Sequence, residues 1–326
     1  MLCATVFLLW FSLKNIEAPP GQSKFDFIRG TWEQADKFLL TLSALVAVLS
    51  HLVRAERWRL MLKPIGYPVG LLQSFFSVMV GYFINLVIPR GGELSRCLNL
   101  FRLHKVPVET SAGTVVAERL IDVIFLLFFI STSFLVQYDK LTALLSDFLE
   151  KRKAVQAGGG TSYVVWAGIA LLLALLGLVF FLIRTGRLNT VGAKLEVIWT
   201  NLKKGLLSVF TLEKKGLFLF YSLAIWVLYF LMAWFVMLAF EETRILGLGA
   251  SLTVFTLGSI AMAMPLPGGT GSYHVLVPAG LNLFYGLALE KALGFTIVFH
   301  AWQTFVLIVF GLLSLVGSQM MKKKEL

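Results

Sequence analysis

The sequence has 326 residues, of which 58% are hydrophobic and 14% are charged, with 29 Lys and Arg residues against 18 Asp and Glu residues. A mean hydropathy of +0.82 excludes an ordinary soluble domain and predicts an integral membrane protein, because soluble domains carry far more charge. The basic excess indicates cytoplasmic loops and anionic lipid headgroups as partners, rather than nucleic acid.

The first apolar run, Met1 to Leu13, is shorter than the roughly 20 residues that a membrane span needs. It has no basic start and no small-residue cleavage site, so we expect a first span rather than a removable signal peptide. The loop from Lys14 to Lys37 holds four basic and four acidic residues, which is compatible with the outside. The run from Phe38 to Val53 then crosses inward to a basic edge, which the positive-inside rule places in the cytoplasm. This edge contains Arg54, Arg57, Arg59 and Lys63 beside one acidic residue, Glu56.

A break interrupts the next apolar run, which extends from Gly70 to Ile88 and stops at Pro89-Arg90-Gly91-Gly92. The stretch that follows, to Glu109, is mixed, basic and amphipathic, so a broken or re-entrant helix fits better than a full crossing. The run from Leu120 to Gln137 then crosses outward. The loop from Tyr138 to Thr161 contains three consecutive glycines and marks the midpoint of the chain.

The second half begins with an inward span from Tyr163 to Ile183, followed by a loop from Arg184 to Lys215 with seven basic and two acidic residues. This charge predicts a cytoplasmic loop. The run from Leu217 to Phe240 crosses outward. A second interrupted run, Leu248 to Met264, ends at a Pro-Gly-Gly break at residues 265–271.

After this second break, Ser272 to Leu289 forms a return limb, and Leu293 to Met320 crosses inward to three lysines. Paired interruptions in corresponding positions of two halves point to an inverted-repeat transporter. The sequence therefore predicts an all-α polytopic membrane protein, an inverted-repeat bundle of about six full spans plus two broken or re-entrant helix pairs. We expect one transmembrane domain (1–326) with halves 1–157 and 158–326, and a cytoplasmic C-terminus.

Both breaks have the chemistry of a candidate anion site. Proline removes a helical donor and glycine admits unusual dihedrals, so a new helix begins after each break with free backbone N–H groups, which attract anions. Arg90 and Arg96 flank the first break and could hold a phosphate or carboxylate. The local sequence is equally compatible with prolines and glycines that only pack kinked helices.

A second polar group lies in VVAERLIDVIFLL, where Glu118 and Asp122 share one helical face beside Arg119. Ionisable side chains in an apolar run usually mark a pathway. Glu118 or Asp122 could pair with Arg90 or Arg96 or carry a coupling proton, and the alternative is an ion cluster at the cytoplasmic end of the helix.

Three histidines lie in or beside apolar runs, and His274 is the one at a break, so it is a candidate for proton relay or for packing. For His51 and His300 we expect a satisfied packing or interfacial role. The aromatic residues from Trp226 to Trp234 are interpreted as lipid-facing residues or as part of an interfacial aromatic belt.

The sequence resembles the transmembrane region of lysylphosphatidylglycerol synthases, a family of flippase-like membrane proteins that includes stand-alone members without a soluble domain. The resemblance covers nearly the whole chain and rests on RAERWRLML, GGELSR, AERLIDV and PLPGGTGSYH. It implies an inverted-repeat fold with re-entrant helices, in which polar residues around the breaks form a lipid headgroup cavity. It also implies no aminoacyl transfer, which in the full-length synthases needs a following cytosolic domain. Many relatives carry an acidic residue where this chain has His274.

The leading functional hypothesis is a flippase- or scramblase-like translocator of an anionic phospholipid or lipid-linked substrate in the bacterial cytoplasmic (inner) membrane. Its candidate path is formed by Arg90, Glu93, Arg96, Glu118, Arg119 and Asp122, with Gly268, Gly269, Gly271 and His274 at the second break. No ATP-binding loop is present, so a gradient would drive transport or the leaflets would merely equilibrate.

Two alternatives remain open: a membrane-embedded transferase acting on a lipid phosphate, and a membrane scaffold for an envelope enzyme. The sequence has no Asp-x-Asp pair, no HExxH motif and no clustered Cys and His residues, so we expect no enzyme activity, metal or cofactor. Cys3 and Cys97 are too far apart to indicate a disulfide framework. A homodimer is compatible with the sequence.

Overall fold

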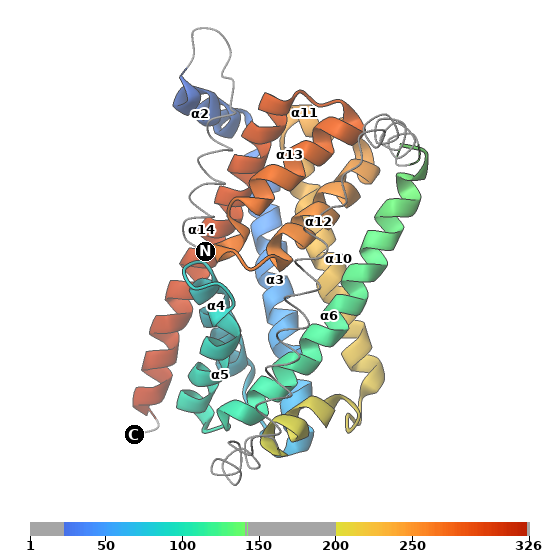
Figure 1. Cartoon of the computed structure of the whole chain (residues 1–326). Coiled ribbons are helices and arrows are strands. Elements are labelled where there is room, and N and C mark those ends of the chain that lie inside the picture. Colours follow the sequence, from blue (N-terminus) through green and yellow to red (C-terminus); the bar gives the residue numbers. More distant parts are fainter. Residues whose placement is uncertain (1–22, 141, 143–199, 325–326) are drawn as a thin grey trace, which may run out of the picture. The chain divides into compact units, whose positions relative to one another are not determined.

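The computed structural model describes residues 23–140, 142 and 200–324 of the chain (Figure 1). The chain divides into two compact units, one formed by residues 1–137 with 202–326 and the other by residues 138–201. Across the described ranges the regular structure is helical, and four helices are long and apolar enough to cross a membrane. The expected spans 1–13 and 163–183, the glycine-rich connection and the boundary at 157/158 lie outside the described residues.

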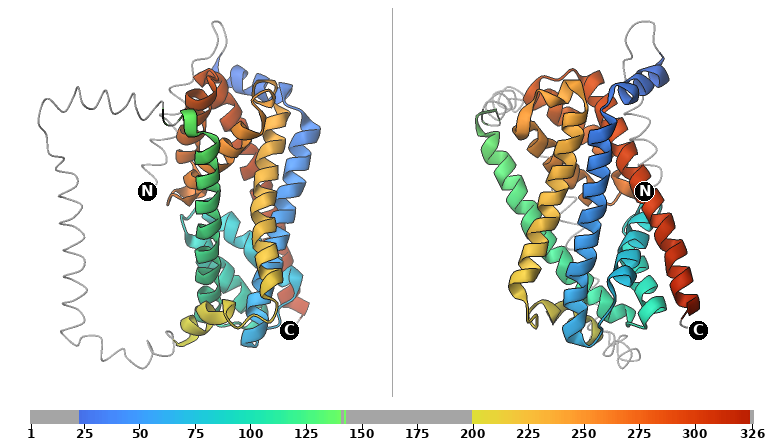
Figure 2. Two further views of the ribbon diagram at one scale, coloured as in Figure 1. Left: turned by 90° about the vertical axis from the view of Figure 1, so that its right-hand side faces the viewer. Right: turned by 180° about the vertical axis from the view of Figure 1, so that it is seen from behind.

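Two long antiparallel helices, α3 (Lys37–Leu62) and α10 (Lys215–Ala239), pack side by side through the first unit (Figures 1 and 2). The backbone N–H of Asp36, just before α3, donates to the carbonyl oxygen of Ala239 at 2.8 Å. Both helices have the length and hydropathy of a membrane span. The start of α3 therefore lies beside the end of α10.

The start of α3 is held by a side-chain cap. One carboxylate oxygen of Asp36 accepts hydrogen bonds from the backbone N–H groups of Phe38 (2.9 Å) and Leu39 (3.1 Å). We expect Asp36→Ala to lower the free energy of unfolding by about 1 kcal/mol, because two helical donors lose their acceptor. Asp36→Asn keeps an acceptor and should recover most of this loss in a detergent unfolding titration. An equal loss in both variants would contradict the capping role and assign the effect to charge.

The first break lies where the sequence predicts it, between α4 (Leu71–Asn85) and α5 (Gly91–His104). Arg90 has a φ of 62°, in the left-handed region that ends one helix and allows the next to start in a new direction. The two helices pack very closely, because a Cβ on Gly92 would lie 2.1 Å from the carbonyl oxygen of Gly81. Only a glycine allows this approach.

The second break joins α12 (Gly247–Ala263) to α13 (Ser272–Tyr285) and contains the short 3-10 helix η3 (Pro267–Gly269). Three glycines of this break have positive φ angles, which L side chains rarely adopt. They are Gly268 (56°), Gly269 (70°) and Gly271 (94°). The α-helical backbone is therefore interrupted between α12 and α13, and the positive φ angles require glycine at these three positions.

The two breaks adjoin one another within the first unit. The Arg90 guanidinium donates a hydrogen bond to the carbonyl oxygen of Ala263 at the end of α12. A Cβ on Gly268 would lie 3.1 Å from the side chain of Leu86, which belongs to the first break. In Figure 1, α4 and α5 extend from this meeting point toward one end of the helices, and α12 and α13 extend toward the other.

Two further long helices flank these elements, α6 (Val108–Val136) and α14 (Leu289–Lys324). Helix α6 packs against α5 and α12, whereas α14 packs against α4 and α13. The contact of α14 with α4 uses Gly311 and Gly317, which face Phe83 and Phe76. The described chain also contains α2 (Lys24–Gln34), η1 (Lys63–Ile65), η2 (Leu207–Val209), α11 (Glu241–Arg244) and helical residues at 138–140, 142 and 200–206.

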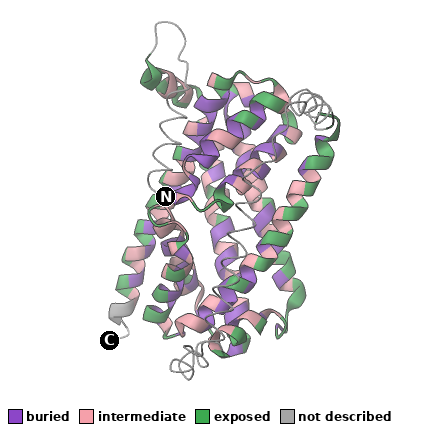
Figure 3. Ribbon diagram, in the orientation of Figure 1, coloured by how far each residue is buried: buried purple, intermediate pink, exposed green. Residues whose placement is uncertain are grey.

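Buried residues line the inward faces of these helices, as Figure 3 shows. The largest apolar cluster includes Trp226 and residues of α10, α12, α13 and α14. The prediction that the Trp226 region faces lipid is wrong for Trp226 itself, which is 6% exposed and stacks on Phe129 with ring centroids 5.5 Å apart. High hydropathy around a span does not distinguish its lipid face from its core face.

Candidate functional site

Four charged side chains of α3 and α6 form a buried network. The two Glu118 carboxylate oxygens accept hydrogen bonds from Arg57 (3.3 Å) and from Arg96 of α5 (2.6 Å). Asp122 accepts from Arg54 (2.9 Å) and from Arg57 (3.0 Å), so Arg57 bridges the two acids. The Arg57 and Glu118 side chains are fully buried. The network therefore ties three helices together.

Helical spacing explains why these groups meet. Glu118 and Asp122 are four residues apart on α6, and Arg54 and Arg57 are three residues apart on α3, so each pair occupies one face of its helix. Arg54 and Arg57, two of the arginines of the predicted basic edge, are therefore buried inside the protein. Helix α3 continues past them to Leu62, and both side chains point into the protein.

Glu118 and Asp122 also lie well inside their helix. Helix α6 begins at Val108, ten residues before Glu118, so the alternative of an ion cluster at the helix end is wrong. Both carboxylates are buried among guanidinium groups. An ionised group removed from water needs such partners, because the desolvation of an isolated charge costs several kcal/mol or more.

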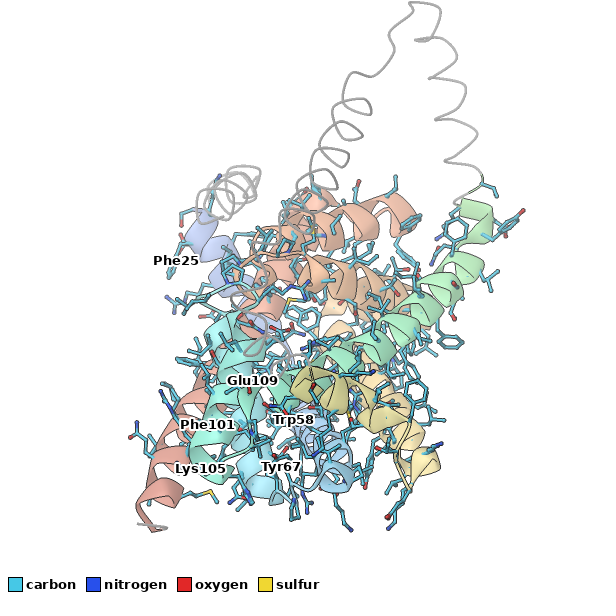
Figure 4. The ribbon with its side chains drawn as sticks, turned by 60° about the horizontal axis from the view of Figure 1, so that its bottom comes forward. Phe25, Trp58, Tyr67, Phe101, Lys105 and Glu109 are labelled. Atoms are coloured by element: carbon cyan, nitrogen blue, oxygen red, sulfur yellow. The ribbon has the colours of Figure 1, made fainter. Side chains whose placement is uncertain are left out.

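Arg96 is held in place by an aromatic side chain as well as by Glu118. Its guanidinium carbon lies 4.0 Å from the centre of the Trp58 ring, in a cation–π contact. The Trp58 indole N–H donates to the hydroxyl of Thr114 on α6 at 2.8 Å. Figure 4 shows Trp58 near the α5–α6 connection, which Lys105 and Glu109 mark.

Hydroxyl groups extend the network toward α4 and α10. The Tyr229 hydroxyl accepts from Arg54 Nε at 3.3 Å and lies 3.1 Å from the Tyr82 hydroxyl. Arg57 also donates to Ser222 at 3.1 Å. The His51 ring packs 4.4 Å from the Tyr82 ring, in agreement with the expected packing role. Its buried Nδ1 has no hydrogen-bond partner among the described residues.

A small open hollow lies beside this network, between α4, α5 and α6. Its cavity volume is about 10 Å³, room for about one water molecule, so a larger ligand fits only if the lining side chains move apart. It is lined by Val78, Gly81, Tyr82, Asn85, Gly92, Glu93, Arg96 and Arg119. The Asn85 side chain accepts from the Gly92 N–H at 2.8 Å, which fixes the first turn of α5. The hollow is therefore adjacent to the first break.

Arg119 and Glu93 connect the hollow to the buried acids. Arg119 lies 3.2 Å from one Glu93 carboxylate oxygen and 3.4 Å from Asp122. Four arginines and three carboxylates then form one network, whose formal charge is +4 − 3 = +1. In a poorly screened environment an uncompensated positive charge attracts an anion strongly.

The structure brings together five of the predicted site residues and leaves five elsewhere. Glu93, Arg96, Glu118, Arg119 and Asp122 belong to the charge network. Of the two arginines predicted as alternative partners of the acids, Arg96 pairs with Glu118, whereas Arg90 is exposed and donates to Ala263. The other four residues, Gly268, Gly269, Gly271 and His274, form the second break.

The second break has its own histidine pair. His274 Nδ1 accepts from the Gly271 N–H at 3.4 Å, and its ring lies edge-on to His300 at 4.8 Å. His300 Nε2 lies 2.9 Å from the Gly268 carbonyl oxygen. Both histidines therefore support the backbone of the break. No group of three or more His, Cys, Asp or Glu side chains suited to a metal occurs in the described part of the chain.

Sequence reasoning missed three members of the site: Arg54 and Arg57 as inward-facing groups, and Tyr229. The three-residue spacing of Arg54 and Arg57 could have indicated one shared helical face, matched by the four-residue spacing of Glu118 and Asp122 elsewhere in the chain. Tyr229 had no signal of its own, because it sits in a uniformly apolar and aromatic run.

Comparisons with known proteins identify the family of this chain. The profile of the family described as the lysylphosphatidylglycerol synthase TM region matches residues 2–311. The chain is 33% identical over 104 residues to the UPF0104 membrane protein MJ1595 of Methanocaldococcus jannaschii, and this match covers 31% of the chain and 30% of that relative's length. No solved structure matches. Because the profile covers most of the chain, the protein belongs to the lysylphosphatidylglycerol synthase TM-region family.

Proposed function

We propose that this protein moves an anionic phospholipid, or another lipid-linked anion, between the leaflets of the membrane. The observation that carries the proposal is the buried charge network of formal charge +1 beside an open hollow at the first break. A lipid phosphate would supply the missing negative charge through guanidinium donors. The acyl chains would stay outside in the lipid.

The arrangement of the breaks supports a transport role. Two helix pairs, α4 with α5 and α12 with α13, meet break to break through Arg90–Ala263 and Leu86–Gly268. Non-helical backbone at membrane depth is tolerated where protein or a water-filled cavity surrounds it. We take the two pairs as re-entrant elements of an inverted repeat, with the substrate site at their junction.

The charges at the two ends of the first unit favour one orientation. The end that holds α2, α11 and the start of α14 carries Lys24, Arg29, Lys37, Arg244 and Lys291 against Asp26, Glu33, Asp36, Glu241, Glu242 and Glu290. The opposite end carries Arg59, Lys63, Arg102, Lys105, Lys203, Lys204, Lys214 and Lys215 against Glu56, Glu109 and Glu213. The positive-inside rule assigns this second end, with the C-terminal end of α14, to the cytoplasmic side of the cytoplasmic membrane.

The transferase alternative has less support. A general base needs a free carboxylate oxygen within reach of its proton. Both oxygens of Glu118 and both oxygens of Asp122 are engaged by guanidinium groups. These acids hold the arginines in position and are poorly suited to proton abstraction.

The test is a translocation assay in liposomes with fluorescent phosphatidylglycerol and neutral phosphatidylcholine, read by dithionite quenching. We expect wild type to move phosphatidylglycerol selectively. Arg96→Ala and Arg119→Ala should each slow this movement about tenfold or more, since a lost charge-assisted hydrogen bond costs about 1.5–3 kcal/mol. The matched control is Arg29→Ala, which removes an exposed arginine of α2 and should leave the rate unchanged.

The Arg119 variant keeps the assay informative, because Arg119 is half-exposed and contributes less to the fold than Arg96. If folded Arg119→Ala and Arg96→Lys proteins both moved phosphatidylglycerol at the wild-type rate, the site would lie elsewhere. If wild type moved neither lipid, with or without a pH gradient, translocation of these lipids would be wrong.

A further inference from the structure

Three buried polar atoms without a partner belong to residues that line the same hollow. They are Arg96 Nε, Arg119 Nε and Glu93 Oε2, and no hydrogen-bond partner for them exists among the described residues. Buried polar groups in native proteins are nearly always hydrogen-bonded. Each of these three unpaired atoms therefore needs a water molecule or a ligand as its hydrogen-bond partner. Three such atoms on residues around one hollow make it the candidate ligand site.

The unpaired arginine and glutamate atoms need different groups on a ligand. An arginine Nε–H is a donor, so Arg96 and Arg119 require an acceptor, and their charge favours an anion. An ionised carboxylate only accepts, so Glu93 Oε2 requires a donor. A bare anion cannot satisfy all three, because it would place negative charge beside Glu93 without giving it a hydrogen bond.

The unpaired arginine donors and the unpaired glutamate acceptor belong to neighbouring residues. Glu93 and Arg96 are three residues apart on α5 and therefore share a face, and Arg119 is 3.2 Å from the other Glu93 oxygen. A ligand that reaches both guanidinium groups thus carries its donor only a few bonds from its anionic group. A phosphodiester with an adjacent polar headgroup has this form.

Charge decides which donor fits. The network has a formal charge of +1, which one phosphodiester neutralises. With a neutral hydroxyl donor, the net charge of the network and its bound ligand stays at zero. With an ammonium donor, this net charge returns to +1 in a poorly screened site. We infer that Glu93 determines headgroup specificity, an inference that rests on the proposed function. Glu93 accepts a hydrogen bond from a hydroxyl of an anionic phospholipid, and the phosphodiester of this lipid binds Arg96 and Arg119.

The inference is tested by equilibrium binding to the full chain in detergent, with short-chain lipids below their micellar concentration and calorimetric detection. Phosphatidylglycerol carries a phosphodiester and hydroxyls, phosphatidylmethanol carries the same charge without a hydroxyl, and phosphatidylethanolamine carries an ammonium. We expect wild type to bind phosphatidylglycerol about fivefold to tenfold more tightly than phosphatidylmethanol, the ratio that corresponds to about one hydrogen bond. Phosphatidylethanolamine should bind more weakly than either.

The diagnostic variants alter Glu93 alone. Glu93→Leu should remove the preference for phosphatidylglycerol while it retains or strengthens the binding of phosphatidylmethanol, because the network keeps its arginines and loses a negative charge. Glu93→Gln keeps an acceptor oxygen and should keep the preference. Retained phosphatidylmethanol binding shows that the variant is folded, since misfolding would weaken both ligands.

Each outcome decides a separate point. Equal affinity of wild type for the two anionic lipids, or a preference that persists in Glu93→Leu, overturns the role of Glu93 but leaves anion binding by Arg96 intact. Tighter binding of phosphatidylethanolamine would identify an ammonium donor and overturn the hydroxyl. If Arg96→Ala bound both anionic lipids as wild type does, the proposed site itself would be wrong.

Discussion

Glu118→Gln is expected to lower the free energy of unfolding by about 3–5 kcal/mol, the loss typical of removing one partner from a buried ion pair. Among the residues that the structure describes, Glu118 is the one acid that pairs directly with Arg96; it shares Arg57 with Asp122, and its side chain is fully buried. The neutral amide would leave the Arg96 guanidinium, whose side chain is 4% exposed, without a counter-charge. Unfolding in mixed micelles with increasing SDS measures the change.

The control is Glu241→Gln, which neutralises an exposed glutamate of α11 and should change stability by no more than about 0.5 kcal/mol. Because Arg57 and Glu118 are in contact, Arg57→Leu combined with Glu118→Leu should destabilise less than the sum of the single changes. If Glu118→Gln were as mild as Glu241→Gln, the buried network would not contribute to stability.

The positions of both breaks could be predicted because proline and glycine act locally. Proline lacks the N–H that an α-helix requires, and glycine allows the positive φ angles found at Gly268, Gly269 and Gly271. These constraints depend on a few neighbouring residues. The apolar limbs that form α4, α12 and α13 were equally visible, whereas α5 follows the first break as a mixed, basic and amphipathic stretch.

The arginines of α3 show that local sequence patterns do not predict which side chains are buried. The positive-inside rule counts Lys and Arg near the end of a span, and it takes no account of the helical face that each occupies. Arg59 is 34% exposed and pairs with Glu56, whereas Arg54 and Arg57 turn inward to α6. Only the packing of α3 against α6 separates these roles, and no local pattern states which helices are neighbours.

Arg90 and Arg96 make the same point for the first break. Both flank Gly91-Gly92 in the sequence, and both were equally plausible anion ligands. Arg90 precedes α5 and turns away to Ala263, while Arg96 lies inside α5 and reaches Glu118 and Trp58. The direction in which α5 leaves the break decides between them, and that direction depends on the glycine contact with α4.

Gly92→Ala is therefore expected to have the second large effect, a loss of about 3 kcal/mol in the free energy of unfolding, at the upper end of typical overpacking costs. The new Cβ would lie 2.1 Å from the Gly81 carbonyl oxygen and 2.6 Å from the Asn85 side chain, so α4 and α5 must separate. The same SDS titration measures the loss, and the liposome assay should show slower phosphatidylglycerol movement.

Gly30→Ala is the matched control, since Gly30 lies inside α2 with nothing within 4 Å of its new Cβ. A helical Gly to Ala change in open space should stabilise by up to about 1 kcal/mol. Gly92→Ala removes no charged or polar side chain, so a defect in both stability and transport would show that the hollow depends on how closely α4 and α5 approach. Wild-type stability together with wild-type transport in Gly92→Ala would contradict this close packing and the placement of Glu93 and Arg96 that depends on it.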